Sequence, residues 1–173
     1  MGNQTLQFNV SSLLKQGTGT RELYSFVAPM KFDNVKIASD IKGKVEIMKI
    51  DDGVNAKMED VRLMMDFRCD LCLKSFKQEV LINRAERQYL FEGPHESVDP
   101  NDLFLIDMKN ETIDLKEPLR QEIILHLPLI PVCSRSCKGI CPHCGKNRNR
   151  EQCKCRTEKT LNKPLSALKQ LLK

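Results

Sequence analysis

Cysteine is the residue type in this chain whose spacing points most directly to chemistry. Six of the eight cysteines fall within residues 133–155, and the other two stand in the short motif CDLC at residues 69–72. Thiolates at such spacing can act as nucleophiles, form disulfides or hold a metal ion. Residues 1–17 lack the basic start and apolar stretch of a secretory signal. We therefore expect a cytoplasmic protein whose thiols stay reduced.

The motif Cys141-Pro-His-Cys144-Gly has the spacing of a zinc knuckle. Two residues between the cysteines let both thiolates reach one ion at about 2.3 Å. The proline pre-sets the turn, and the glycine permits a positive φ that directs backbone amides at the sulfurs. Cys153 and Cys155 are the simplest partners, although an extended Cys-x-Cys separates its sulfurs too widely for one tetrahedral ion unless the chain bends.

The pair in CDLC needs two further ligands to complete a closed site. Cys133 with Cys137, or one of these with His143, would supply them, while a single site built from the two Cys-x2-Cys pairs is equally allowed by spacing. The sequence predicts structural zinc, as one or two ions. The candidate ligands are Cys69, Cys72, Cys133, Cys137, Cys141, Cys144, Cys153 and Cys155.

Redox chemistry, catalytic zinc and an iron–sulfur cluster are the competing interpretations of these cysteines. A redox Cys-x2-Cys belongs near a βαβ pattern, and we expect the Asp70 carboxylate to raise the pKa of its neighbouring thiols. Catalytic zinc needs a nearby acid or base, for which residues 133–173 offer only Glu151 and Glu158. An iron–sulfur cluster would use the same four thiolates and stays open. With no nucleophile triad or phosphate-binding glycine loop in the sequence, we predict that the protein is not an enzyme.

Charge is distributed unevenly along the chain. Residues 133–173 hold 11 lysines and arginines against two glutamates, whereas residues 1–132 hold 17 basic and 21 acidic side chains. A basic segment of this kind predicts a polyanionic partner such as RNA, although a solvated basic loop without a partner is the plainer alternative. The candidate nucleic-acid-binding residues are Lys138, Lys146, Arg148, Arg150, Lys154 and Arg156.

Two asparagines alternate with the basic side chains between the cysteine pairs. We expect Asn147 and Asn149 to add hydrogen bonds to base edges, while the arginines grip phosphates. Residues 133–173 contain no Phe, Tyr or Trp on which bases could stack. The pattern therefore favours recognition of the backbone or shape of structured RNA.

The elements that position these residues show mainly a two-residue period. Apolar residues alternate over 41–50, 61–67 and 76–82, and residues 51–53, DDG, are typical of a hairpin turn. This pattern predicts an antiparallel meander with one face in water. Before it, residues 6–10 predict a short strand, Ser11 or Ser12 is a candidate cap for a helical turn, and residues 17–26 predict a loop.

Helices are predicted in the second half of the chain. Residues 91–102 predict a loop and residues 103–115 a strand. A helix follows over 115–127, with Asp114 and Glu117 at capping-box spacing and Pro128 ending it. Its expected buried stripe is Leu115, Leu119, Ile123 and Leu127, and a terminal helix would carry Leu165, Leu168, Leu171 and Leu172.

The sequence thus predicts an α+β fold: an antiparallel β-meander sheet with two or three helices and a C-terminal, cysteine-rich, zinc-ribbon-like appendage. The expected division is a sheet domain at 1–132, with its helix near 115–127, and a basic cysteine-rich tail with a terminal helix at 133–173. No apolar run approaches the roughly 18 residues that a membrane span needs, so no membrane partner is expected.

Three motifs in this order resemble the YceD-type large ribosomal RNA accumulation proteins. They are FRCDLCLKSF at 67–76, IDLKEPLRQEIILHLPLIPVC at 113–133 and CKGICPHCGKNRNREQCKC at 137–155. NKPLSALKQLL near the C-terminus also resembles that family's terminal helix, so the resemblance runs from about Ile41 onward. The residues that match the family's motifs are Cys69, Cys72, Phe76, Cys137, Gly139, Cys141, Pro142, Cys144 and Gly145. Arg148-Asn149 departs from the Leu-Asn common in the family and makes this loop more basic.

The resemblance implies a bacterial or plastid protein that supports accumulation of the 23S ribosomal RNA, with no established catalytic activity. We therefore predict a non-enzymatic factor for large-subunit assembly that binds ribosomal RNA or a pre-ribosomal particle, or a ribosomal protein, and takes no small-molecule substrate. The alternative is a zinc-ribbon adaptor between proteins without direct RNA contact. A nuclease or thiol oxidoreductase ranks third.

Overall fold

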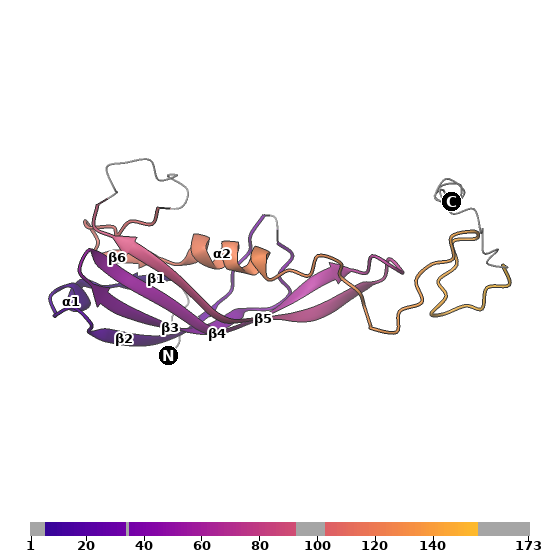
Figure 1. Ribbon diagram of the computed structural model, residues 1–173, viewed down its shortest axis with the longest axis horizontal. Helices are drawn as coiled ribbons and strands as arrows, with labels where there is room; N and C mark the ends of the chain where they lie inside the picture. The colour runs from indigo at the N-terminus through magenta and orange to yellow at the C-terminus, as the bar shows by residue number, and fades with distance from the viewer. Residues whose placement is uncertain (1–5, 34, 93–102, 156–173) are drawn as a thin grey trace, which may run out of the picture.

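The main sheet has four antiparallel strands in the order β2–β3–β4–β5. These are β2 (Arg21–Ala28), β3 (Ile41–Ile50), β4 (Gly53–Arg68) and β5 (Ser75–Leu90). The computed structural model describes residues 6–33, 35–92 and 103–155 (Figure 1). Each strand pairs with the next one along the chain, so the sheet is a meander, and the two-residue period predicted three of its four strands.

The prediction of a loop over residues 17–26 was wrong in its second half, because β2 begins at Arg21. Gly19 has a φ of 90°, and its amide donates to the Lys49 carbonyl at 2.8 Å, so the glycine turn ends where the strand starts. β2 then pairs with β3 along its entire length. It lies at the sheet edge, where only Phe26 and Ala28 are buried, and its periodicity is correspondingly weak.

The hairpin between β3 and β4 has the predicted two-residue turn. Ile50 pairs with Gly53, which leaves two aspartates to make the turn. A Cβ added at Gly53 would lie 1.9 Å from the carbonyl oxygen of Tyr89. Glycine is required here because β5 approaches the β4 backbone closely at that point.

The core lies between the inner face of this sheet and four short elements. These are β1 (Gln7–Asn9), α1 (Ser11–Leu14), β6 (Thr112–Asp114) and α2 (Lys116–Leu125), of which β1 and β6 pair with each other. Leu115, Leu119 and Ile123 of the predicted helical stripe are fully buried, and Leu127 packs against the same core. Each fully buried side chain of this size stabilises the fold by about 1.5–3 kcal/mol. Within the described part of the chain, no helix has the length and hydropathy to span a membrane.

The predicted side-chain caps were wrong at both helices. α2 begins one residue later than expected, at Lys116. Asp114 accepts a hydrogen bond from the Lys116 amide, and Glu117 pairs with Arg120 instead of completing a capping box. At α1 the carboxamide of Asn9 accepts from the Ser11 amide, so the local bond comes from a side chain two residues before the first candidate serine.

Residues 103–115 form less strand than their apolar pattern predicted. Only isolated bridges at Leu105 and Asp107 precede β6. The Asp107 carboxylate accepts from the amides of Lys109 and Asn110, which folds the chain into a turn, and Glu111 follows with a φ of 50°. Most of the predicted loop at 91–102 lies outside the described residues. The predicted terminal helix lies wholly outside them.

β4 and β5 continue beyond the other strands as a two-stranded arm. Pairing of β3 with β4 stops at Arg62, whereas β4 and β5 remain paired as far as Arg68 and Ser75. Near the end of the arm the rings of Phe67 and Phe76 stack with their centroids 5.8 Å apart. A ribbon of two strands has little stability alone, so its tip, at residues 69–74, depends on what packs there.

The chain returns from α2 to the tip of this arm (Figure 1). An ion pair of 3.0 Å between Arg87 and Glu122 helps to hold α2 against β5. The segment after the helix then runs beside the arm, and the Pro131 carbonyl accepts a hydrogen bond of 2.9 Å from the Asp70 amide. The predicted division at residue 133 stays a prediction, but the sheet and the tail meet at this tip.

Candidate metal centres

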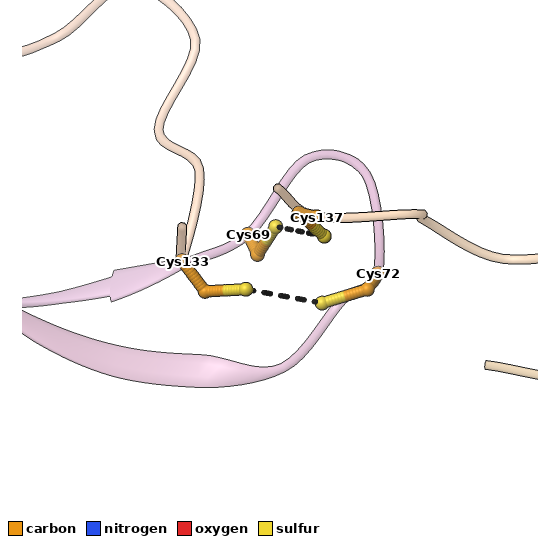
Figure 2. Close-up of side chains that lie close together, drawn as sticks. All are labelled: Cys69, Cys72, Cys133 and Cys137. Carbon is orange, nitrogen blue, oxygen red and sulfur yellow. Dashed lines mark hydrogen bonds between the residues drawn. The ribbon is translucent and has the colours of Figure 1, made fainter. Parts of the chain in front are cut away.

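The first cluster consists of Cys69, Cys72, Cys133 and Cys137. Their four sulfurs lie within 4.8 Å of one another, with 3.8 Å between Cys69 and Cys137 and 3.6 Å between Cys72 and Cys133. Figure 2 shows the sulfurs turned toward one another, two from the arm's hairpin turn and two from the segment after α2. Residues more than 60 positions apart in the sequence therefore share one site.

These separations fit a single four-coordinate metal ion. A tetrahedron with metal–sulfur bonds of about 2.3 Å has sulfur–sulfur edges of about 3.8 Å. A disulfide would bring two sulfurs to about 2.05 Å, and all eight described cysteines are free. Several metal atoms between the cysteines, as in an iron–sulfur cluster, would hold the sulfurs farther apart than the observed edges.

The hairpin turn that supplies two of these ligands is tightly hydrogen bonded. The Cys69 carbonyl accepts from the Leu73 amide at 2.8 Å, and the Cys69 amide donates to the Lys74 carbonyl at 2.9 Å. Leu73 adopts a φ of 60°, which closes the turn. Cys69 and Cys72 are buried, whereas Cys133 and Cys137 are half-buried.

The second cluster consists of Cys141, Cys144, Cys153 and Cys155. Its sulfurs also lie within 4.8 Å of one another, and Cys153 is 3.3 Å from Cys141 and 3.5 Å from Cys144. Gly145 has a φ of 70°, as the knuckle motif predicted, and its amide donates to the Cys141 carbonyl.

The chain bends between the last two cysteines, which brings both of their sulfurs into one cluster. The amide of Cys155 lies 3.4 Å from the sulfur of Cys153. A cluster built from both Cys-x2-Cys pairs is not formed, and His143 is exposed and belongs to neither group. The structure thus brings the eight cysteines together as two sets of four.

One thiol in each cluster is favoured as a thiolate. Burial raises the pKa of Cys69. Hydrogen bonds from the backbone of Cys133, Cys72 and Leu71 have the larger combined effect and lower that pKa to about 6. The expectation that Asp70 would raise it was therefore wrong. In the second cluster, backbone amides of the knuckle lower the pKa of Cys141 to about 6.

A second thiol in each cluster holds its proton. Hydrogen bonding to Cys72, followed by burial, raises the pKa of Cys133 to about 12, and hydrogen bonding to Cys153 raises that of Cys155 to about 12. Four adjacent thiolates repel one another unless a cation lies among them. A bound dication would let all four ionise, so metal binding would release protons.

Comparison with known proteins places these cysteines in a family context. Residues 60–172 match the family described as "Large ribosomal RNA subunit accumulation protein YceD", and this span contains both clusters. The chain belongs to the YceD family. This agrees with the resemblance of the three motifs and rests on well over half of the chain.

Individual relatives match over shorter stretches. Uncharacterized proteins of Mycobacterium tuberculosis and Mycobacterium bovis are 34% identical over 79 residues, which is 44% of this chain and 37% of theirs. The chloroplastic "Large ribosomal RNA subunit accumulation protein YCED homolog 1" of Arabidopsis thaliana is 35% identical over 46 residues, 27% of this chain and 14% of its own. The matches thus span well under half the length of these relatives. No solved structure matches the chain.

The basic side chains of this YceD family member lie on the surface around the clusters. Lys138, Lys146, Arg148, Arg150 and Lys154 are all exposed, and Arg156 lies outside the described residues. Lys146 makes a 3.5 Å ion pair with Glu151, in which both side chains are more than half exposed. Such a pair adds little stability, so positive charge remains available on this surface.

The two asparagines of the same loop contribute to the structure, which the sequence did not predict. The Asn149 side chain binds the Lys138 amide and the Cys137 sulfur, and that of Asn147 binds the Cys72 carbonyl. The expected contacts to base edges would compete with these bonds. The position of the two asparagines between two cysteine pairs was the available signal of this structural role, because short polar side chains often satisfy backbone groups in such turns.

A group of exposed apolar residues was also missed. Leu125, Leu129 and Ile130 are 72%, 99% and 66% exposed, just before the first tail cysteine. The sequence signal was present, because the run IILHLPLIPV has more apolar residues than one buried helical stripe requires. Exposed apolar side chains grouped in this way are typical of a contact surface.

Proposed function

We propose that this protein is a non-enzymatic factor that supports accumulation of 23S ribosomal RNA, and hence large-subunit assembly, by binding ribosomal RNA or a pre-ribosomal particle. The observation that carries the proposal is an exposed basic loop that the second four-cysteine cluster closes between Cys144 and Cys153. The description of the YceD family, which names accumulation of large ribosomal RNA, supports the same proposal.

The cysteine clusters would act by shaping the basic surface. A zinc ion in each cluster would hold residues 133–155 in one conformation, so that little conformational entropy is lost when the loop meets RNA. Arg148 and Arg150 then present guanidinium groups that bind phosphates in a bidentate manner. With no Phe, Tyr or Trp in residues 133–155, contacts to the RNA backbone are favoured over base stacking.

The sheet domain would provide a second contact within the particle. Its charge balance is slightly acidic, with 17 basic and 21 acidic side chains in residues 1–132. This balance is less suited than the tail to a phosphate backbone. We assign direct RNA contact to the tail and a supporting contact, with RNA or a ribosomal protein, to the sheet. The proposed setting is the cytoplasm, with no membrane and no small-molecule substrate.

Salt-dependent RNA binding tests the proposal. Filter binding of transcribed 23S ribosomal RNA would compare the wild type with the triple variant Lys146→Ala/Arg148→Ala/Arg150→Ala. The slope of log affinity against log salt should fall by about one for each phosphate that the variant no longer neutralises. A matched variant, Lys15→Ala/Lys31→Ala/Lys36→Ala, removes three exposed charges from the sheet domain and should bind nearly as well as wild type.

Two results would contradict RNA contact by the tail. One is the absence of measurable RNA affinity for the wild type at low salt. The other is an equal reduction of affinity in the tail and sheet-domain variants, which would indicate a diffuse effect of net charge.

A second candidate function is a protein–protein adaptor, favoured by the exposed apolar residues after α2. Leu129 and Ile130 could bind a ribosomal protein or another assembly factor without RNA contact. The variant Leu129→Ser/Ile130→Ser should then lose association with pre-ribosomal particles, whereas the wild type should show no affinity for naked RNA. Leu23→Ser, at a residue 69% exposed on β2, is the matched control.

A further inference from the structure

We propose that the two cysteine clusters bind their metal ions cooperatively, through Asn147 and Asn149. Both asparagines lie in the connecting loop, residues 145–152, which the second cluster closes between Cys144 and Cys153. Both side chains reach residues of the first cluster. The inference rests on the proposed metal sites and is independent of RNA binding.

Asn149 contacts a ligand of the first cluster directly. Its Oδ1 accepts a hydrogen bond of 2.8 Å from the Lys138 amide, and its Nδ2 donates to the Cys137 sulfur at 3.4 Å. A hydrogen bond to a metal-bound thiolate fixes its orientation and stabilises its charge. Asn149 therefore serves the first cluster as a positioning residue, although the second cluster closes the loop that carries it.

Asn147 holds this carboxamide in place and makes a second connection. Its Oδ1 accepts from both the amide and the Nδ2 of Asn149, each at 3.0 Å. Its own Nδ2 donates to the Cys72 carbonyl at 3.4 Å, which belongs to the hairpin turn of the arm. The two asparagines thus connect the loop to two residues of the first cluster: Cys72 from the arm and Cys137 from the segment after α2.

Backbone hydrogen bonds place the segment 138–140 between the two sites. The Ile140 amide donates to the Leu71 carbonyl in the hairpin turn, and the Arg148 amide donates to the Gly139 carbonyl, both at 2.9 Å. Ile140 and Asn147 also form an isolated antiparallel bridge. The segment that follows Cys137 is therefore shared by both sites.

Hydrogen bonds and one exposed ion pair, rather than buried side chains, fix the connecting loop in this position. Asn147 is its least exposed member, and none of residues 145–152 is buried. The conformational entropy of eight residues opposes order, and a few net hydrogen bonds are too weak to overcome it alone. When the second cluster binds metal, the closure of the loop removes most of that entropy before Asn149 meets Cys137.

Metal in the second cluster should consequently raise the affinity of the first. Linkage makes the effect reciprocal, so metal in the first cluster raises the affinity of the second by the same factor. We expect a factor of about tenfold, at the lower end of the usual range of about 5–150-fold. This coupling would favour a protein with both sites filled over one with a single ion.

A thermodynamic cycle measures this factor with zinc alone as the probe. Cys144→Ser/Cys153→Ser leaves only the first site, and Cys69→Ser/Cys72→Ser leaves only the second. Competition with a zinc chelator, monitored by native mass spectrometry, gives the affinity of each single site and the overall two-zinc constant of the wild type. The wild-type constant should exceed the product of the single-site constants by about tenfold.

The asparagine is tested in the same cycle. Asn149→Ala should reduce the coupling factor toward one while changing the first-site affinity little when the second site is disabled. Arg148→Ala, a neighbouring exposed substitution in the same loop, should leave the factor unchanged.

Three results would overturn the inference, and they differ in what else they overturn. Two zinc ions bound with a coupling factor near one would contradict cooperativity and leave the metal sites intact. Tenfold coupling that survives Asn149→Ala would contradict the assigned route. Wild-type protein that binds no zinc would overturn the metal sites together with their coupling.

Discussion

The sheet domain and the cysteine-rich segment obtain their order from different sources. The sheet domain buries a continuous core in which Val45, Ile47, Met58 and Ile82 have no exposed surface. In the described residues beyond 127, the only buried side chain is that of Cys141. Hydrophobic burial can therefore specify the first region without a ligand, whereas the second has little apolar contact and would depend on metal ions bound at its two cysteine clusters.

Metal removal should produce the largest difference between the two regions. After a chelator removes zinc, residues 133–155 should lose protection against amide hydrogen exchange, while β3, β4 and the core of β5 keep theirs. The expected effect is large because structural zinc contributes about 10–16 kcal/mol in zinc-finger peptides at pH 7. Hydrogen exchange monitored by mass spectrometry makes the comparison, and full protection of residues 133–155 without metal would contradict it.

A core substitution should produce the opposite pattern. Ile82→Ala removes a fully buried side chain and should lower the free energy of unfolding of the sheet domain by about 2–5 kcal/mol. Denaturant unfolding gives this value, and the zinc content at low denaturant should stay as in the wild type. Leu81→Ala is the matched control, since Leu81 precedes Ile82 in the same strand and its side chain is 41% exposed. Equal losses in the two variants would show that burial does not dominate here.

A glycine substitution should test the contact between the two regions. Gly139 has a φ of 68°, and an added Cβ would lie 3.0 Å from the Leu71 carbonyl oxygen in the hairpin turn. Gly139→Ala should cost about 1–2 kcal/mol from the left-handed backbone alone, and more from this contact. Gly145 also has a positive φ, of 70°, but a Cβ added there lies in open space. The difference between Gly139→Ala and Gly145→Ala therefore measures the effect of the contact with Leu71. Zinc release to a chelator should be faster for Gly139→Ala than for Gly145→Ala.

The smallest effect on stability is expected at the basic surface. Arg148→Ala should change the free energy of unfolding by less than about 0.5 kcal/mol, because the side chain is exposed. Under the proposed function it should nevertheless reduce the salt slope of RNA binding by about one. Thermal unfolding and filter binding on the same preparation separate the two quantities. A stability loss comparable with that of Ile82→Ala would mean that Arg148 has a structural role.

Local patterns predicted much of the sheet domain. Residues 41–50 alternate between buried and partly exposed positions as a strand with one wet face requires, and the two-residue turn follows from DDG. β2 was missed because an edge strand with few buried residues has little periodicity, and two glycines precede it. The capping box failed because α2 begins after Asp114, a shift of one residue that spacing alone does not determine.

The candidate metal sites were only partly predictable. The knuckle at Cys141 and Cys144 follows from local spacing, since its ligands share one turn. The grouping of Cys69 with Cys137 depends on where the arm ends and on the path of the chain after α2, neither of which spacing gives. The structural use of Asn149 was obscured because asparagine among arginines also fits a nucleic-acid contact.

The length of the arm has a consequence for how this protein can vary during evolution. β4 and β5 each span 16 residues, and the return path over 126–132 must reach the same tip. Insertion of one residue into a single strand would turn the cysteine motif to the other face of the ribbon, because side chains alternate. A lengthened arm thus needs two residues in each strand, an advance of about 7 Å, and a longer return path to match. Three separated stretches of sequence are in this way constrained to change length together.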